Sequence, residues 1–145
     1  LGAPYWNSEA KACICGMTRT TGRNEIVRAA LDCIACQITD ILTAMEQDSG
    51  MKLEKLCVDG GPTRNGYLMQ LQSDLSKVQV RVPKAEELSG IGAAYLAGIA
   101  LGIYQEDTLF LGMEYQTFVP KMEEAEREKK LSAWKEAVNS VIKCR

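Results

Sequence analysis

The fold of this 145-residue chain is decided at Val58-Asp59-Gly60-Gly61-Pro62-Thr63-Arg64-Asn65. The run Lys55 to Val58 predicts a short strand, and Pro62 is typical of the first turn of a helix, which we expect to reach about Leu75. Paired glycines let the backbone come close to a ligand, because they carry no Cβ. The N-terminus of the helix directs unpaired N–H groups into the same space. The stretch therefore predicts a strand-to-helix turn that can hold a ligand.

Asn65 is the side chain of this stretch with the most specific chemistry. We expect it one turn into the helix, where its amide offers both hydrogen-bond donors and acceptors, as needed to meet the edge of a purine. The same eight residues also fit a tight strand-to-helix turn with a capping asparagine and no ligand. Taken alone, the stretch leaves both interpretations open.

The residues that follow continue the pattern of alternating elements. The valines from Val78 to Val82 alternate as in a strand, and Pro83 is expected to end it. Two strands that flank a helix predict a βαβ unit with parallel pairing. A further helix is expected to reach about Gly102, with Glu86 and Glu87 at the positive end of its dipole. The chain is therefore predicted to have an α/β fold that is rich in helix.

Helices are also predicted on both sides of this unit. Apolar residues recur at helical spacing from Arg23 to Gln47, where Thr20 or Thr21 is expected to cap the start and Gly50 to follow the end. A terminal amphipathic helix is predicted from Glu123 to Lys143. Its buried stripe is expected to comprise Leu131, Trp134, Val138 and Val141, and Glu126 is expected to pair with Lys130.

The first 21 residues are predicted to be mostly loop, with one short strand from Ala12 to Met17. The chain opens on Leu1 and shows no signal-peptide pattern, so we expect it to be part of a longer protein. Its composition, with 46% hydrophobic and 25% charged residues, is that of one globular domain. A net charge of −2 without a basic tract argues against nucleic-acid binding. The absence of histidine removes the commonest general base and metal ligand.

The six cysteines are predicted to be reduced thiols of a cytoplasmic protein, because the chain has enough apolar residues to form a core without disulfides. Cys33 and Cys36 stand inside the first predicted helix, and Cys13 and Cys15 lie in the predicted strand. Neither pair sits in the loops that zinc sites favour, so no metal site is predicted. A thiol redox role for Cys33 and Cys36 stays open, and it would require an exposed Cys33 with a lowered pKa.

Small residues give the helix before Gly102 an unusual surface, and two interpretations of it fail. Gly90-x-Gly92-x-x-Tyr95 resembles a dinucleotide-binding motif, but the third glycine is replaced by Tyr95 and no acidic residue follows on a second strand. Leu88 to Tyr104 carries no charge, yet its glycines and flanking glutamates favour a buried helix over a membrane span. The face expected to allow close helix packing comprises Gly90, Ala93, Ala94, Ala97 and Gly98.

Three blocks of this sequence together resemble the glycerol kinases of the FGGY carbohydrate kinase family. The longest is Val58-Asp59-Gly60-Gly61-x-x-x-Asn65-x-x-Leu68-Met69-Gln70-x-Gln72-Ser73-Asp74, which is similar to the family's adenine-side motif. The other two blocks, in the same order as in the family, are Leu1-Gly2-Ala3-Pro4-Tyr5-Trp6 and Gly92-Ala93-Ala94-Tyr95-Leu96-Ala97-Gly98. Phe118 and the segment around Trp134 match the terminal helix more loosely, so the likeness covers nearly the whole chain.

The resemblance implies a fold and a set of roles. Residues 1–145 would be the helix-rich C-terminal part of an actin-like, ribonuclease-H-like ATPase domain, with a short parallel βαβ core. Gly61 would contact the nucleotide through its backbone, Asn65 would contact the adenine, and Gly60 would shape the turn. The family's phosphate-binding hairpin, polyol site, catalytic aspartate and three further strands of a five-stranded sheet would all lie upstream of Leu1.

The function implied for the intact protein is ATP- and Mg²⁺-dependent phosphorylation of glycerol to glycerol 3-phosphate. The chain alone is expected to be inactive, with no catalytic residue and no membrane contact. Open alternatives are a sibling kinase for another polyol or ketose and a non-catalytic structural module. Because uncovered strand edges and apolar faces favour pairing, the chain is also expected to form homo-oligomers.

Overall fold

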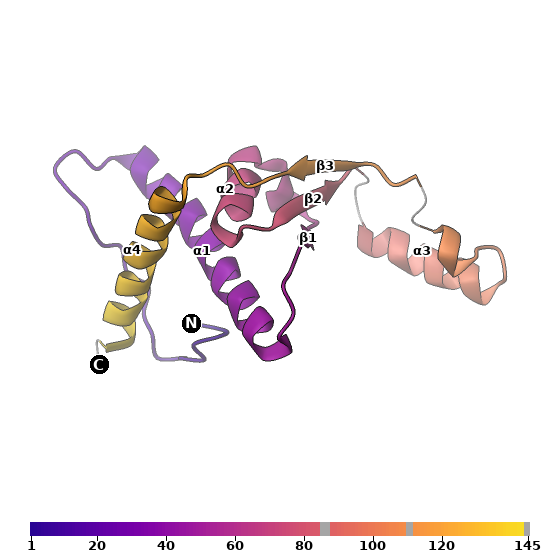
Figure 1. Ribbon diagram of the computed structural model, residues 1–145, viewed down its shortest axis with the longest axis horizontal. Helices are drawn as coiled ribbons and strands as arrows, with labels where there is room; N and C mark the ends of the chain where they lie inside the picture. The colour runs from indigo at the N-terminus through magenta and orange to yellow at the C-terminus, as the bar shows by residue number, and fades with distance from the viewer. Residues whose placement is uncertain (85–87, 110–111, 144–145) are drawn as a thin grey trace.

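The computed structural model describes residues 1–84, 88–109 and 112–143. The predicted residues Glu86 and Glu87 therefore lie outside the described part. The elements in chain order are α1 (Arg23–Ser49), β1 (Lys55–Cys57), a 3₁₀ turn (Gly61–Arg64), α2 (Gly66–Ser76), β2 (Gln79–Pro83), α3 (Leu88–Ala100), a second 3₁₀ turn (Glu106–Thr108), β3 (Tyr115–Phe118) and α4 (Glu124–Lys143). Helices α1, α2 and α4 gather at one end of the molecule, the sheet lies in the middle, and α3 extends at the other end (Figure 1).

The sheet has three strands in the order β1-β2-β3. Strands β1 and β2 are parallel, with Leu56 opposite Val80, and α2 connects them. The predicted βαβ unit is thus confirmed. Strand β3 is a strand that the sequence did not predict, and it pairs antiparallel with β2. Its sequence Tyr-Gln-Thr-Phe has apolar residues only at its two ends, so it lacks the alternation by which strands are recognised.

Two boundaries of this unit differ from the prediction. Pro83 was expected to end the strand, but it is paired with Tyr115, and Lys84 N–H still donates to Glu114 O at 2.9 Å. The pairing survives because proline loses only its own N–H donor. Residues 12–17 were expected to form a strand and form none. A strand needs a neighbour for its backbone groups, and within the described residues none of the three strands pairs with this segment.

Helix α1 begins differently from the prediction and ends as predicted. The N-cap is Gly22 and neither Thr20 nor Thr21, and the Glu25 carboxylate accepts a hydrogen bond from Gly22 N–H at 2.8 Å. The threonines are engaged in a turn of their own, in which Thr21 Oγ1 accepts from Thr18 N–H at 2.8 Å. At the other end, Gly50 has φ +68° and donates its N–H to Glu46 O at 2.9 Å, which confirms the predicted left-handed cap.

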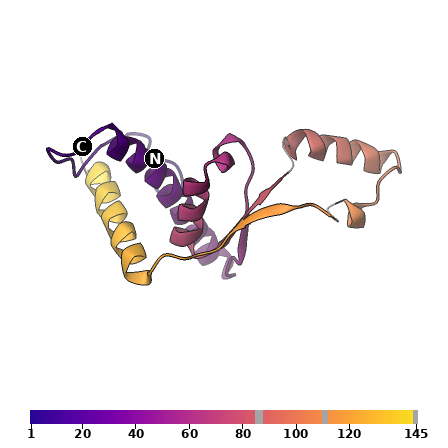
Figure 2. The same cartoon turned by 90° about the horizontal axis from the view of Figure 1, so that it is seen from above.

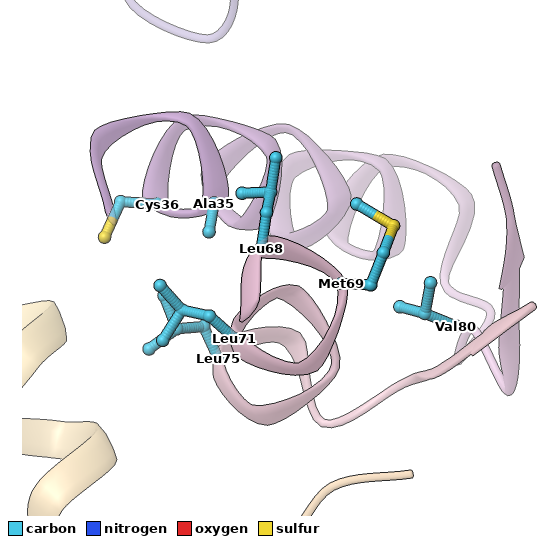
Figure 3. Close-up of a cluster of buried hydrophobic side chains, with 7 residues drawn as sticks. All are labelled: Ala35, Cys36, Leu68, Met69, Leu71, Leu75 and Val80. Atoms are coloured by element: carbon cyan, nitrogen blue, oxygen red, sulfur yellow. The ribbon is translucent and has the colours of Figure 1, made fainter. Parts of the chain in front are cut away.

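The core lies around α2, the connecting helix of the βαβ unit. Figure 3 shows α2 presenting leucines and a methionine towards α1, with Val80 of β2 at the side. The predicted inward side chains of Leu68, Leu71 and Leu75 are all buried. Gln72, Ser73 and Asp74 are buried as well, so α2 is enclosed on nearly every side. The buried cluster comprises Ala35, Cys36, Leu68, Met69, Leu71, Leu75 and Val80.

Two helices leave apolar side chains exposed. On α1 the buried positions are Ala35, Cys36, Thr39 and Leu42, whereas the large exposed ones are Ile26, Val27, Ile34, Ile41 and Met45. Helix α3 was expected to be buried, yet of its residues only Gly98 is, while Leu96 is 70% exposed. The small-residue face of α3 therefore packs on no other helix of the described residues. The reason is its position, away from α1, α2 and α4 in both views (Figures 1 and 2).

Helix α4 packs beside α1 largely as the sequence predicts. Val138 is buried, and Leu131, Trp134 and Val141 of the predicted stripe are partly buried. Lys130 was expected to pair with Glu126 in its own helix, but its Nζ lies 3.4 Å from Asp32 Oδ2 of α1. Of the helices that the structure describes, none combines the length and the apolar character needed to cross a bilayer.

Candidate functional site

The turn between β1 and α2 is held in shape by its own backbone. Gly60 has φ +97° and ψ 173°, a conformation that side chains with a Cβ rarely adopt. The carbonyl oxygen of Gly60 accepts from Thr63 N–H at 3.0 Å and from Thr63 Oγ1–H at 2.7 Å. These two bonds close the 3₁₀ turn and fix the direction in which the chain leaves the sheet.

Asn65 begins α2, which corrects the prediction that places it one turn inside the helix. Its backbone is extended (φ −87°, ψ 97°), so the 3₁₀ turn and α2 are separate elements. Its Oδ1 accepts from Leu68 N–H at 3.1 Å, which confirms the capping interpretation for that atom. The cap uses only the oxygen of the amide. The Nδ2 group carries two further donors, so capping and binding of a ligand are compatible in one side chain.

Gly61 faces open space. A Cβ built at Gly61 meets no protein atom within 4 Å among the described residues, although the turn around it is tightly bonded. At the start of α2, the first N–H groups have no acceptor inside the helix and favour negative charge nearby. The structure thus brings the three predicted site residues, Gly60, Gly61 and Asn65, into one turn at the end of β1. Their contact with a nucleotide stays a prediction.

Sequence reasoning missed a polar cluster behind this turn. Tyr67, in the first turn of α2, donates its hydroxyl hydrogen to Asp32 Oδ1 of α1 and accepts from Arg28 Nε–H at 2.6 Å. Burial raises the pKa of Tyr67 to about 12, and the bond to Asp32 and its charge act in the same direction. No local pattern announces this cluster, because Tyr67 and Asp32 are 35 positions apart.

An apolar cavity of about 510 Å³ lies beside the turn, between the end of the sheet and α3. Val58 and Asp59 form one side of it, and Ile91 and Tyr95 of α3 form the other. Gly60, Gly61 and Asn65 are not among its lining residues, so cavity and turn are neighbouring but separate features. The cavity walls are mainly carbon, which suits an apolar group better than a charged one.

The cysteines show no redox or metal arrangement in the part of the chain that the structure describes. Burial raises the pKa of Cys36 to about 12, helped by the charges of Asp32 and Asp40. This shift is opposite to the one that activates a thiol. The five described cysteines are free, and Cys33 accepts a hydrogen bond from Gln37. Among the described residues, no three acidic or cysteine side chains gather as a metal site would require.

Comparisons with known proteins identify relatives of the whole chain. Residues 1–101 match the model of the C-terminal domain of the FGGY family of carbohydrate kinases. The chain is 49% identical to a glycerol kinase of Petrotoga mobilis over 140 residues, which is 95% of this chain and 28% of the relative. It is 44% identical to a glycerol kinase of Brevibacillus brevis over 144 residues, 98% of this chain and 29% of the relative.

A solved structure agrees with these matches. The crystal structure of Plasmodium falciparum glycerol kinase with ADP superimposes on 96% of this chain, and the chain covers 28% of that structure. The TM-score is 0.85 and the sequence identity 38%. The predicted fold class, a helix-rich α/β part of the actin-like, ribonuclease-H-like ATPase architecture, is therefore confirmed. The chain spans less than a third of the length of the relatives that it matches.

Proposed function

This chain belongs to the FGGY family of carbohydrate kinases, and from that premise we propose that it supplies the adenine side of the nucleotide site of a glycerol kinase. The intact protein transfers the γ-phosphoryl group of ATP to a primary hydroxyl of glycerol, with glycerol 3-phosphate as product. The observation that carries the proposal is the turn at Gly60, Gly61 and Asn65, where open space, a helix N-terminus and spare amide donors meet.

The residues of the turn have different roles in this proposal. Gly60 holds the backbone in a conformation that sends the chain past the ligand, because its φ of +97° suits glycine. Gly61 lets the nucleotide come against the backbone, since nothing of the protein fills the space at its Cα. Asn65 donates from Nδ2 to an acceptor on the edge of the adenine, while Oδ1 keeps α2 capped.

Other parts of phosphoryl transfer are not assigned to this chain. Such a transfer needs positioned phosphates, Mg²⁺ to neutralise their charge, and a carboxylate that accepts the proton of the attacking hydroxyl. The described residues offer no acidic cluster for the metal, so no residue here is assigned to Mg²⁺. We expect the chain alone to form no glycerol 3-phosphate, and we place the intact kinase, with its reduced cysteines, in the cytoplasm.

The experiment that tests the proposal uses the intact protein with ATP and Mg²⁺. Glycerol, other polyols and ketoses are offered in turn, and the phosphorylated product is identified by mass. We expect the highest kcat/KM with glycerol. A higher kcat/KM with a ketose would assign the chain to a sibling kinase, and no phosphorylation of any polyol or ketose would contradict the proposal. The Asn65→Ala variant should raise the KM for ATP several-fold and leave the KM for glycerol unchanged, because only the nucleotide loses a contact.

A further inference from the structure

The first turn of α2 is fastened to α1 by one side chain, that of Tyr67. Its hydroxyl donates to Asp32 Oδ1 and accepts from Arg28 Nε–H at 2.6 Å. The Arg28 guanidinium carbon also lies 4.2 Å from the centroid of the Tyr67 ring. Because the hydroxyl acts as donor and acceptor at once, its direction is fixed by two partners one helical turn apart on α1.

Asp32 extends the same connection to a third helix. Its Oδ2 lies 3.4 Å from Lys130 Nζ of α4, and both side chains are largely shielded from solvent, with exposed fractions of 27% and 29%. Arg28 lies 3.8 Å from Asp32 Oδ1 as a second cation. A carboxylate that is partly buried and held between two cations is a stable acceptor. The position of the Tyr67 hydroxyl is therefore set jointly by α1 and α4.

Tyr67 stands two residues after Asn65, in the turn that Asn65 caps. The leucines Leu68, Leu71 and Leu75 hold α2 against the core along its length. The hydrogen bond from Leu68 N–H to Asn65 Oδ1 transmits the position of that first turn to the Asn65 amide. Any shift or fraying of the first turn would move the spare Nδ2 donors. Such displacements of a binding group, by about 1 Å, are enough to weaken a bound contact considerably.

We propose that Tyr67, held by Asp32 and Arg28, is a positioning residue for the nucleotide, and that it acts through Asn65. This inference rests on the proposed function, since it assumes that Asn65 meets the adenine. Tyr67 itself does not touch the nucleotide. Its hydroxyl keeps the first turn of α2 in the place where the Asn65 amide is directed at the ligand.

The chain contains a matched control. Tyr5 donates its hydroxyl hydrogen to Asp40 Oδ2 of α1 at 2.8 Å, also across 35 positions, and the pKa of Tyr5 is likewise raised to about 12 by burial and by Asp40. Asp40 lies eight residues after Asp32, roughly 12 Å further along α1. Tyr5→Phe thus removes the same kind of bond without touching the turn at Asn65.

The test compares Tyr67→Phe, Tyr5→Phe, Asn65→Ala and the double variant Asn65→Ala/Tyr67→Phe in the intact protein. The KM for ATP, the KM for glycerol, kcat and the thermal midpoint are measured for each. We expect Tyr67→Phe to raise the KM for ATP several-fold with the KM for glycerol and kcat unchanged. Tyr5→Phe should lower the thermal midpoint similarly and leave the KM for ATP unchanged. In the Asn65→Ala background, Tyr67→Phe should add nothing further to the KM for ATP.

The outcomes separate the two levels of the argument. If Asn65→Ala leaves the KM for ATP unchanged, the nucleotide role of the turn is wrong, and this inference falls with it. If Asn65→Ala raises that KM but Tyr67→Phe does not exceed Tyr5→Phe, the inference alone is overturned. It is also overturned if the two substitutions multiply their effects on the KM for ATP, because Tyr67 then acts independently of Asn65.

Discussion

Trp134 of α4 donates its indole N–H to Asp40 Oδ2 of α1 at 2.6 Å, across 94 positions of sequence. The same carboxylate oxygen accepts the Tyr5 hydroxyl at 2.8 Å. One acidic side chain thus joins the N-terminal segment, α1 and the terminal helix. Hydrogen bonds to a charged acceptor that is partly shielded from water are stronger than neutral ones. The docking of α4 therefore depends on Asp40 as much as on the apolar stripe of α4.

Replacing Trp134 by Phe should loosen α4. The phenyl ring keeps most of the apolar contact but leaves Asp40 without one donor, which should cost about 1–3 kcal/mol. The measurement is amide hydrogen exchange of α4 peptides in the intact protein, where faster exchange reports easier local opening. Lys135→Ala is the control, because Lys135 is an exposed neighbour in the same helix. Equal exchange in both variants would show that the bond to Asp40 does not hold α4.

Gly60 and Gly61 should respond differently to substitution. Gly60→Ala forces a Cβ into a left-handed conformation and should cost about 1–2 kcal/mol of stability. Gly61→Val meets no protein atom at Cβ and should leave the thermal midpoint nearly unchanged, but it should raise the KM for ATP because the side chain occupies the space of the nucleotide. Thermal unfolding and ATP kinetics of the intact protein decide this. A normal KM for ATP in Gly61→Val would remove Gly61 from the site.

The described cysteines should react with iodoacetamide in a defined order. Cys13, Cys15 and Cys57 are exposed and should be alkylated first. Cys36 is buried, and its pKa is raised to about 12, so at neutral pH almost none of it is the reactive thiolate. Mass spectrometry of peptides over a time course gives the order, with urea-unfolded protein as the control. Early labelling of Cys36 in the folded protein would contradict its place in the core.

Stability should fall at alkaline pH. Burial and nearby carboxylates raise the pKa of Cys36, Tyr5 and Tyr67 to about 12, from ordinary values of 9.0 and 10.0 for the two groups. Each folded-state pKa lies above the unfolded value, so the stabilisation is complete below pH 9 and is lost as the pH rises towards 12. Unfolding by urea at pH 7 to 11 measures this loss. Tyr5→Phe and Tyr67→Phe should each flatten the alkaline decline, and an undiminished decline in both would contradict the assignment.

The 145-residue chain studied by itself should associate with itself. Strand β1 is at an edge of the sheet, and α1 exposes Ile34 and Ile41. Open edges and apolar faces favour pairing with another copy. Sedimentation over a concentration series should show an average mass that rises with concentration, and Ile34→Lys/Ile41→Lys should lower it. A monomer at every concentration would contradict the expectation of a homo-oligomer.

Local chemistry determined the part of the fold that could be predicted. The alternating valines before Pro83, the leucines of α2 and the left-handed Gly50 each follow from spacing or from one residue's conformational preference. The turn at Gly60 and Gly61 was recognisable for the same reason, because a strand followed by two glycines and a proline has few other solutions. The two parallel strands and their connecting helix follow from the order of these signals.

The remainder was decided by contacts between residues that are far apart in sequence. Strand β3 exists because β2 offers its free side to Tyr115–Phe118, whereas residues 12–17 find no such partner. Asn65 became a cap instead of a helical residue once the 3₁₀ turn took the preceding four positions. The bonds from Tyr67 to Asp32 and from Trp134 to Asp40 span 35 and 94 positions. Such pairs leave no trace in local periodicity, because only the packing of α1, α2 and α4 brings their atoms together.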